Sequence, residues 1–221
     1  MKTKTTSNSS TIRIILYYGV CLIILVGFQF GNFLPNTYQT FIGINLTLTL
    51  YTSIYVAYYW KQLHPLLHIS TVKWKPLLSM VILVLLVGLL VYFLPHWNNT
   101  FTYHTNDQLI LVFWDSNFPR LYSLLFLCIQ PALFEELAFR GFLFNHLIER
   151  FSVPVSIFLS AFLFASLHLS VFLLLWLLPI GMLFAYFRHK YNSLWYSITG
   201  HFCYNFTIIF LDFYYNWSIV M

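Results

Sequence analysis

The sequence predicts an all-α membrane protein, a polytopic bundle of about seven transmembrane helices. Of the 221 residues, 60% are hydrophobic and 8% are charged, whereas a soluble domain carries roughly 25% charged residues. A soluble domain of this size could not keep so much apolar surface from water. The composition therefore excludes a soluble enzyme and a disordered chain, and makes the lipid bilayer the expected partner. The basic residues are scattered over segment ends, so no nucleic acid partner is expected.

Three uncharged runs in residues 1–95 predict three N-terminal helices. A membrane helix needs roughly 20 mostly apolar residues. The first run, Ile14–Phe33, is longer than the roughly 7–15 apolar residues of a signal peptide and ends without a small-x-small cleavage site, so we expect a retained helix. The next two runs are Tyr38–Trp60 and Pro76–Leu94.

The second half of the chain predicts a helical core over residues 118–213. A polar stretch runs from His96 to about Arg120, and a helix then opens over Leu121–Phe134 and continues to about Glu149. Three more runs complete the set: Val153–Leu169, Val171–Phe187 and Leu194–Leu211. Because the chain contains no repeat, no low-complexity tract and no room for a soluble domain, residues 1–221 are expected to form one membrane domain.

The basic residues predict the orientation, since Lys and Arg concentrate in cytoplasmic loops. Counting crossings from a cytoplasmic N-terminus puts nine of the ten basic residues outside the spans on the cytoplasmic side, with Arg120 as the exception. The nine are Lys2, Lys4, Arg13, Lys61, Lys73, Lys75, Arg150, Arg188 and Lys190, whereas Asp107, Asp115 and Asp212 fall in the opposite loops. With its small size and bare loops, the chain is expected in a bacterial plasma membrane.

Two adjacent glutamates inside the fourth run are the strongest functional signal, because charged groups within a span are costly and mark function. Glu136 and Arg140 are four residues apart in the favourable acid-before-base order, so we expect an ion pair. Glu135 is rotated by about 100° around the helix, which leaves its carboxylate free to work. Pro131 lacks a backbone donor and should loosen the turn before it.

Three further polar residues are expected to reach the same depth as Glu135. A helix break between Arg150 and Pro154 makes an antiparallel hairpin, which brings His168 level with Glu135. His201 lies about 12 Å into the last run, and Asn205 follows one turn later on the same face. A carboxylate, two imidazoles and an amide in a water-filled cavity open to the cytoplasm are the parts of a hydrolase.

Three ordered motifs resemble the CAAX protease and bacteriocin-processing (CPBP, or Abi) family of intramembrane proteases. Residues 135–141 have the form EExxxRG, residues 164–168 the form FxxxH and residues 201–205 the form HxxxN. The resemblance covers about a third of the chain and implies an endopeptidase that acts at the membrane. It implies that Glu135 and His168 activate the attacking water, that Glu136 and Arg140 support the site, and that His201 and Asn205 bind the oxyanion.

The need for a metal is left open by the residues. No CxxC pair and no HExxH motif are present, but Glu135, His168 and His201 could form a Glu/His/His zinc triad. The eukaryotic CAAX-processing members look like glutamate proteases without an essential metal. We therefore expect either no cofactor or a divalent metal such as zinc, and favour water activation without metal.

Two functions compete with proteolysis. A non-catalytic bacteriocin immunity protein could keep the same fold and bind a bacteriocin or its receptor. A proton-coupled transporter would also bury Glu and His, although seven spans without an internal repeat argue against it. The favoured function is an endopeptidase of the CAAX-processing or bacteriocin self-immunity type, whose substrate is a membrane-associated peptide or protein.

Overall fold

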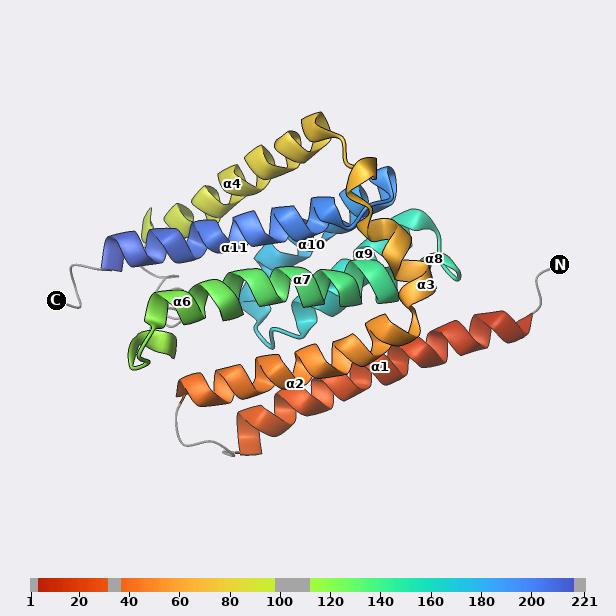
Figure 1. Cartoon of the computed structure of the whole chain (residues 1–221), viewed down its shortest axis with the longest axis horizontal. Helices are drawn as coiled ribbons and strands as arrows, with labels where there is room; N and C mark the ends of the chain where they lie inside the picture. Colours follow the sequence, from red (N-terminus) through yellow and green to blue (C-terminus); the bar gives the residue numbers. More distant parts are fainter. Residues whose placement is uncertain (1–3, 32–36, 98–111, 217–221) are drawn as a thin grey trace.

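The computed structural model describes the backbone of residues 4–31, 37–97 and 112–216, and these segments are helical, with short turns between the helices (Figure 1). No β-strand occurs in these three segments. The all-α helix bundle expected from the sequence is therefore confirmed. The expected polar stretch falls largely on residues 98–111, and this part, like Lys2 and Asp107, lies outside the described residues.

The N-terminal part contains three long helices and a short linking segment. α1 (Lys4–Gly31) and α2 (Thr37–Tyr58) pack side by side, and the Tyr17 and Thr52 hydroxyls bond across them at 2.8 Å. The link consists of α3 (Trp60–Leu63) and two 3₁₀ turns, η1 (His64–Leu67) and η2 (Ile69–Thr71). α4 (Trp74–Trp97) then runs along α11 (Trp195–Asn216), where Gly88 lets Thr207 approach closely.

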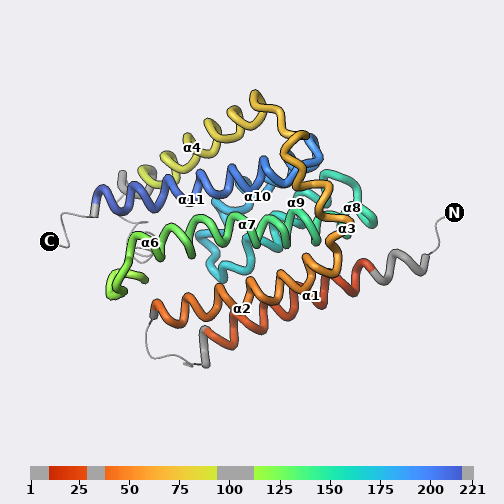
Figure 2. Tube along the Cα trace, viewed as in Figure 1, coloured from red at the N-terminus to blue at the C-terminus, as the bar shows by residue number. Residues whose placement is uncertain are grey.

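A continuous helical rod over residues 119–148 carries the two glutamates (Figure 2). It contains α6 (Pro119–Ser123), the π-helical turn η3 (Leu124–Ile129), α7 (Gln130–Glu136), the π-helical turn η4 (Leu137–Leu143) and α8 (Phe144–Ile148). The first π turn ends directly before Gln130-Pro131, so the loosening expected at this proline is confirmed. Wide turns of this kind are frequent at functional sites.

α9 (Val153–Ser166) and α10 (Val171–Tyr191) form an antiparallel hairpin. Ala161 and Gly181 bring the two helices together, since a Cβ built on Gly181 would meet the Ala161 Cβ at 3.1 Å. The turn between them contains Leu169 with a positive φ of 52°, and the Ser170 hydroxyl caps α10 by accepting the Leu173 N–H.

One expected span is corrected. We expected residues 153–169 to cross the membrane, but α9 has 14 residues, which is roughly 21 Å and too short for a hydrocarbon core of about 30 Å. The Phe164 ring contacts His201, the seventh residue of the 22-residue helix α11, with centroids 5.7 Å apart. The tip of the α9–α10 hairpin therefore lies within the length of the bundle and not at its far end.

Five helical segments are long and apolar enough to cross a membrane: α1, α2, α4, the rod over residues 119–148, and α10. α11 also has the length, but polar residues such as His201 and Asn205 keep it outside this group. Together with α9, the described part of the chain has seven long helical segments, and it is a polytopic membrane bundle.

Apart from Arg120 in α6 and the buried Arg140, the described basic residues gather at one end of the bundle, where α3, α8 and the start of α11 meet (Figure 1). The Arg13 guanidinium lies 5.8 Å from the ring centroid of Tyr59, and Lys73 bonds to Tyr196. Arg188 donates to the Asn145 side chain. This grouping is what the sequence-based orientation requires.

Candidate active site

A buried ion pair between η4 and the end of α7 forms the base of the site. Arg140 Nη1 donates to Glu136 Oε1 at 2.9 Å, and both side chains are fully buried. Arg140 Nη2 donates to the Gly181 carbonyl at 3.1 Å, which ties the pair to α10. The expected pairing is thus confirmed. It allows two opposite charges to lie in the low-dielectric interior, where either one alone would be strongly unfavourable.

Glu135 lies on a different face of the same helix and is not part of that pair. Its side chain is 34% exposed, and its Oε2 is 3.9 Å from His201 Nε2. This distance is too long for a direct hydrogen bond, and a gap of this size is one that a water molecule can bridge. Glu135 is therefore the carboxylate that remains available for chemistry.

His201, on α11, connects the two glutamates. Its Nδ1 is 2.9 Å from Glu136 Oε1, the oxygen that also accepts from Arg140. Because a buried carboxylate paired with a guanidinium is an acceptor only, Nδ1 must carry the proton of this bond. In the neutral ring the Nε2 atom then has a lone pair directed toward Glu135. Only the doubly protonated imidazolium can donate from Nε2.

His168 follows α9 at the tip of the hairpin and is exposed. Its Nδ1 lies 3.2 Å from the Phe164 carbonyl, so Nδ1 is the donor and Nε2 of the neutral ring is left as an acceptor. The Phe164 ring contacts both His168 and His201, with ring centroids 5.2 and 5.7 Å away, and His201 lies beside Glu135. The structure thus brings His168 into the neighbourhood of Glu135, although no hydrogen bond joins these two residues.

Asn205 lies one turn beyond His201 on α11, and its side-chain amide binds a backbone carbonyl of the helical rod. Asn205 Nδ2 donates to the Leu127 carbonyl at 2.8 Å. In a regular helix that carbonyl would accept from residue 131, but Pro131 has no N–H. Asn205 thus satisfies a backbone group that the proline leaves open. The amide has one further N–H.

Two phenylalanines enclose the ion pair and the imidazoles. Phe164 lies 4.4 Å from the Arg140 guanidinium carbon and makes edge contacts with both His168 and His201, at 5.2 and 5.7 Å. Phe184, on α10, stacks on His201 at 5.5 Å and also lies 5.5 Å from the Arg140 carbon. Such contacts favour a buried cation and hold the rings in one orientation.

Sequence reasoning missed Phe184 and Gly181 as parts of this site. Phe164 was noticed only as the first residue of its motif. A Cβ on Gly181 would lie 2.9 Å from Arg140 Nη2, so only glycine leaves room for the guanidinium here. The pairing of a small residue on α9, Ala161, with Gly181 on α10 is the signal that could have indicated close helix packing.

The described side chains do not fit a three-ligand metal site. Among the residues that the structure describes, no group of three His, Cys, Asp or Glu side chains is arranged to hold an ion. Of the Glu/His/His set considered from the sequence, Glu135 and His201 approach each other to 3.9 Å, but His168 does not form a three-ligand group with them.

Fold and site together define the class: a polytopic helical membrane protein with a carboxylate and two imidazoles gathered within its helix bundle. Residues 117–207 match the family model described as type II CAAX prenyl endopeptidase Rce1-like. This is the family of CAAX proteases that the three motifs resemble, and the matched segment contains all six of the polar residues discussed above. The match suggests an intramembrane endopeptidase. No curated protein and no solved structure gives a significant match.

Proposed function

We propose that this protein is an intramembrane endopeptidase that hydrolyses a peptide bond of a membrane-associated peptide or protein with a water molecule activated by Glu135. The observation that carries the proposal is the separation of the two glutamates. Glu136 is neutralised by Arg140 at 2.9 Å, whereas Glu135 is 34% exposed and faces an imidazole nitrogen across 3.9 Å. A general base needs this freedom to reach both water and substrate.

In the proposed first step, a water molecule donates one hydrogen bond to Glu135 and one to His168 Nε2. The bond of His168 Nδ1 to the Phe164 carbonyl favours the tautomer that can accept at Nε2. As the water oxygen attacks the peptide carbonyl, Glu135 takes a proton from it. The protonated Glu135 then gives this proton to the amine as the C–N bond breaks, so Glu135 is regenerated.

In the same scheme His201 and Asn205 stabilise the oxyanion that forms on the substrate carbonyl. Because Nδ1 already donates to Glu136 at 2.9 Å, His201 takes part in this scheme as the imidazolium, the form that also donates from Nε2. Asn205 offers the amide hydrogen that Leu127 does not use. Glu136 and Arg140 do not touch the substrate in this scheme, and they position His201.

The test is turnover of a panel of quenched peptides by protein purified in detergent. Glu135→Gln keeps the size of the side chain and its hydrogen bonding but removes the base, so it should fold and lose turnover by orders of magnitude. Glu149→Gln is the matched control, because Glu149 is an exposed glutamate just beyond the end of the same helical rod. Full activity in Glu135→Gln would end the proposal. Loss of activity on chelation and recovery with zinc would replace it by a metal-dependent mechanism.

For the biological role we propose self-immunity against a peptide bacteriocin or maturation of a secreted peptide, in a bacterial plasma membrane. Expression in a sensitive strain should protect it, and Glu135→Ala should abolish the protection. Protection that survives this substitution would make the non-catalytic immunity protein the better description.

We also propose that the N-terminus is cytoplasmic and that residues 118–213 hold the catalytic core, with residues 1–95 as accompanying helices. The exposed residues Lys75 and Lys190 lie on the basic end of the bundle. Lys75→Cys and Lys190→Cys should be inaccessible to a membrane-impermeant thiol reagent in intact cells and react after lysis. Labelling of either cysteine from outside would overturn the orientation.

A further inference from the structure

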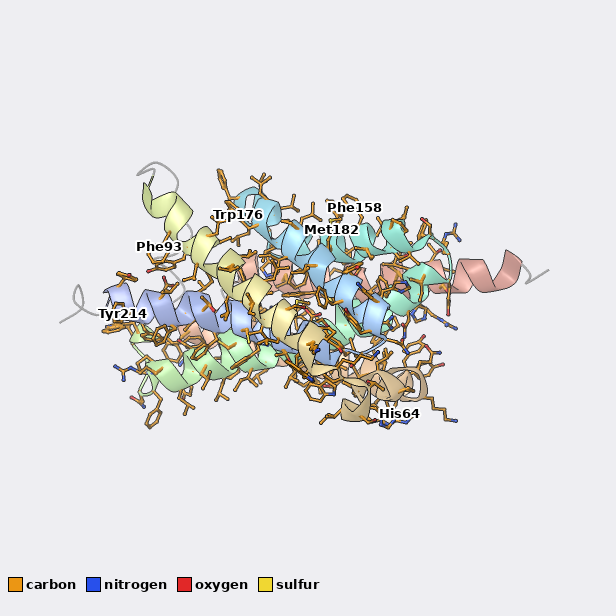
Figure 3. The ribbon with its side chains drawn as sticks, turned by 90° about the horizontal axis from the view of Figure 1, so that it is seen from above. His64, Phe93, Phe158, Trp176, Met182 and Tyr214 are labelled. Carbon is orange, nitrogen blue, oxygen red and sulfur yellow. The ribbon has the colours of Figure 1, made fainter. Side chains whose placement is uncertain are left out.

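The segment that links α2 to α4, residues 60–75, exposes aromatic, aliphatic and basic side chains. It exposes Trp60, Ile69 and Trp74 by 50%, 72% and 67%. It also carries three exposed lysines, Lys61, Lys73 and Lys75. No Asp or Glu occurs anywhere in residues 1–106, so the lysines have no acidic neighbour within their own part of the chain. Figure 3 shows His64, in the middle of the segment, at the edge of the molecule.

The other side of the 60–75 segment is fixed to the core. Leu63 and Leu66 are buried. The Leu66 carbonyl accepts from the Leu194 N–H at 2.9 Å, and the Leu67 carbonyl accepts from the Trp195 indole at 2.7 Å. The segment therefore does not hang free, and its exposed aromatic and basic side chains are held at a defined position.

This position is at the membrane surface. The apolar span Tyr38–Tyr58 ends just before the segment, and the span Trp74–Phe93 begins at its end. Tryptophan is enriched where a helix leaves the hydrocarbon core, because its ring is apolar and its N–H is polar. Lysines at the same level are attracted by negatively charged lipid headgroups.

We propose that the 60–75 segment is a docking surface for anionic lipid headgroups. Lys61, Lys73 and Lys75 bind the headgroups, and Trp60 and Trp74 lie at the border with the hydrocarbon core. Charge complementarity selects the ligand, because the three exposed lysines have no carboxylate partner among the described residues and anionic lipids make the membrane surface negative. The exposed Trp60 and Trp74 side chains favour a bilayer surface over an acidic protein, because an indole ring is best placed where an apolar layer adjoins a polar one. Lys75 already lies 5.5 Å from the Trp74 ring centroid, so a headgroup bound by Lys75 would lie next to that ring.

Lipid bound here would also stabilise the start of α11. The Lys73 N–H donates to the Tyr196 hydroxyl at 2.8 Å, and Tyr196 is buried. The Tyr196 hydroxyl also donates to the Lys73 carbonyl at 3.3 Å. With the bonds from Leu194 and Trp195, this makes four hydrogen bonds between the 60–75 segment and the residues at the start of α11, the helix that carries His201. Occupation of the surface should therefore raise the stability of the bundle, whether or not the protein is a protease.

The first experiment measures thermal stability in nanodiscs of phosphatidylcholine with and without phosphatidylglycerol. We expect phosphatidylglycerol to raise the thermal midpoint by about 2–4 °C. The triple variant Lys61→Gln, Lys73→Gln, Lys75→Gln should lose most of this rise. The triple variant with arginine at the same positions keeps the charge and should retain it. An equal midpoint rise in the glutamine and arginine variants would overturn the proposal.

The second experiment detects the lipid directly through quenching of tryptophan fluorescence by brominated lipids. The fluorescence of Trp60 and Trp74 is obtained by subtracting the signal of the double variant Trp60→Phe, Trp74→Phe from that of the unmodified protein. Brominated phosphatidylglycerol should quench this fluorescence about twofold more than brominated phosphatidylcholine does. In the glutamine triple variant, the two brominated lipids should quench this fluorescence equally. Equal quenching in the unmodified protein would overturn the proposal. So would displacement of phosphatidylglycerol by a soluble polyglutamate peptide at physiological salt, which would assign the surface to an acidic protein partner.

Discussion

The N-terminal helices and the helices from α6 to α11 differ in how much of each is buried. In the apolar windows of α1 and α2, 11% and 6% of the residues are buried, compared with 39% for the rod over residues 119–148 and 33% for α10. The acidic residues follow the same division, because none of the six occurs in residues 1–106. In a bilayer, an apolar helix face needs no protein neighbour, whereas a charged group does.

This difference in burial predicts where substitutions should change stability and activity. Helices that face lipid tolerate a change of apolar side chain, because lipid adapts to the new shape. The buried polar network of α7, α10 and α11 cannot adapt, because each hydrogen bond there has a fixed partner. Substitutions in the polar network should therefore have large effects, and substitutions on the lipid-facing helices small ones.

The largest effect is expected from Arg140→Ala, which leaves Glu136 as a buried charge without its partner. Removing one member of a buried ion pair costs about 3–5 kcal/mol. The yield of monodisperse protein and its thermal midpoint in detergent should both fall. The double variant Glu136→Gln, Arg140→Met carries no unpaired charge and should recover yield better than the single variant. Normal expression of Arg140→Ala would show that the pair does not stabilise the fold.

His201→Ala and Asn205→Ala should each lower kcat by roughly 10²–10³, the usual effect of losing one oxyanion donor. Asn205→Ala also removes the bond to the Leu127 carbonyl, so its thermal midpoint should fall as well. Steady-state kinetics on a cleaved peptide and thermal midpoints separate the two effects. If Asn205→Ala lowers stability but leaves kcat unchanged, the amide serves only the backbone of the rod.

Gly181→Ala should destabilise the bundle by about 1–3 kcal/mol, the range expected for overpacking of a well-packed interior. The new methyl group would lie 2.9 Å from Arg140 Nη2 and 3.1 Å from the Ala161 Cβ. Gly19→Ala on α1 is the matched control, because a Cβ there has no neighbour within 4 Å. The thermal midpoints of the two variants should differ clearly. Equal midpoints would mean that the close approach of α9 and α10 is not maintained in the membrane.

The smallest effect is expected for Ile23→Ala on α1, whose side chain is 72% exposed. The stability should stay within about 0.5 kcal/mol of the unmodified protein, as for most surface positions. Thermal midpoint and peptide turnover check this. A large loss of either property would show that α1 contacts a second protein or the substrate at this face, and that the N-terminal helices are not simply a lipid-facing layer.

Much of this contrast can be predicted from the sequence, because it depends on local spacing. The four-residue separation of Glu136 and Arg140 predicts their pairing without any knowledge of the neighbours. The same rule predicts that Glu135 faces elsewhere. By contrast, the length predicted for the span over residues 153–169 is wrong. The apolar run continues to Leu169, whereas the helix ends at Ser166. The hydropathy pattern cannot indicate a turn that forms inside an apolar run.

The membrane environment, most of the helices and the ion pair follow from the order of the amino acids, because hydropathy and i,i+4 spacing act over short distances along the chain. The groups that surround the ion pair depend instead on how the helices pack. The contact of His201 with Glu136 joins residues 65 positions apart, and the bond of Asn205 to Leu127 joins residues 78 positions apart. The close fit at Gly181 likewise depends on how α9, α10 and the rod pack. No local rule encodes such distances, because they arise when helices meet in three dimensions.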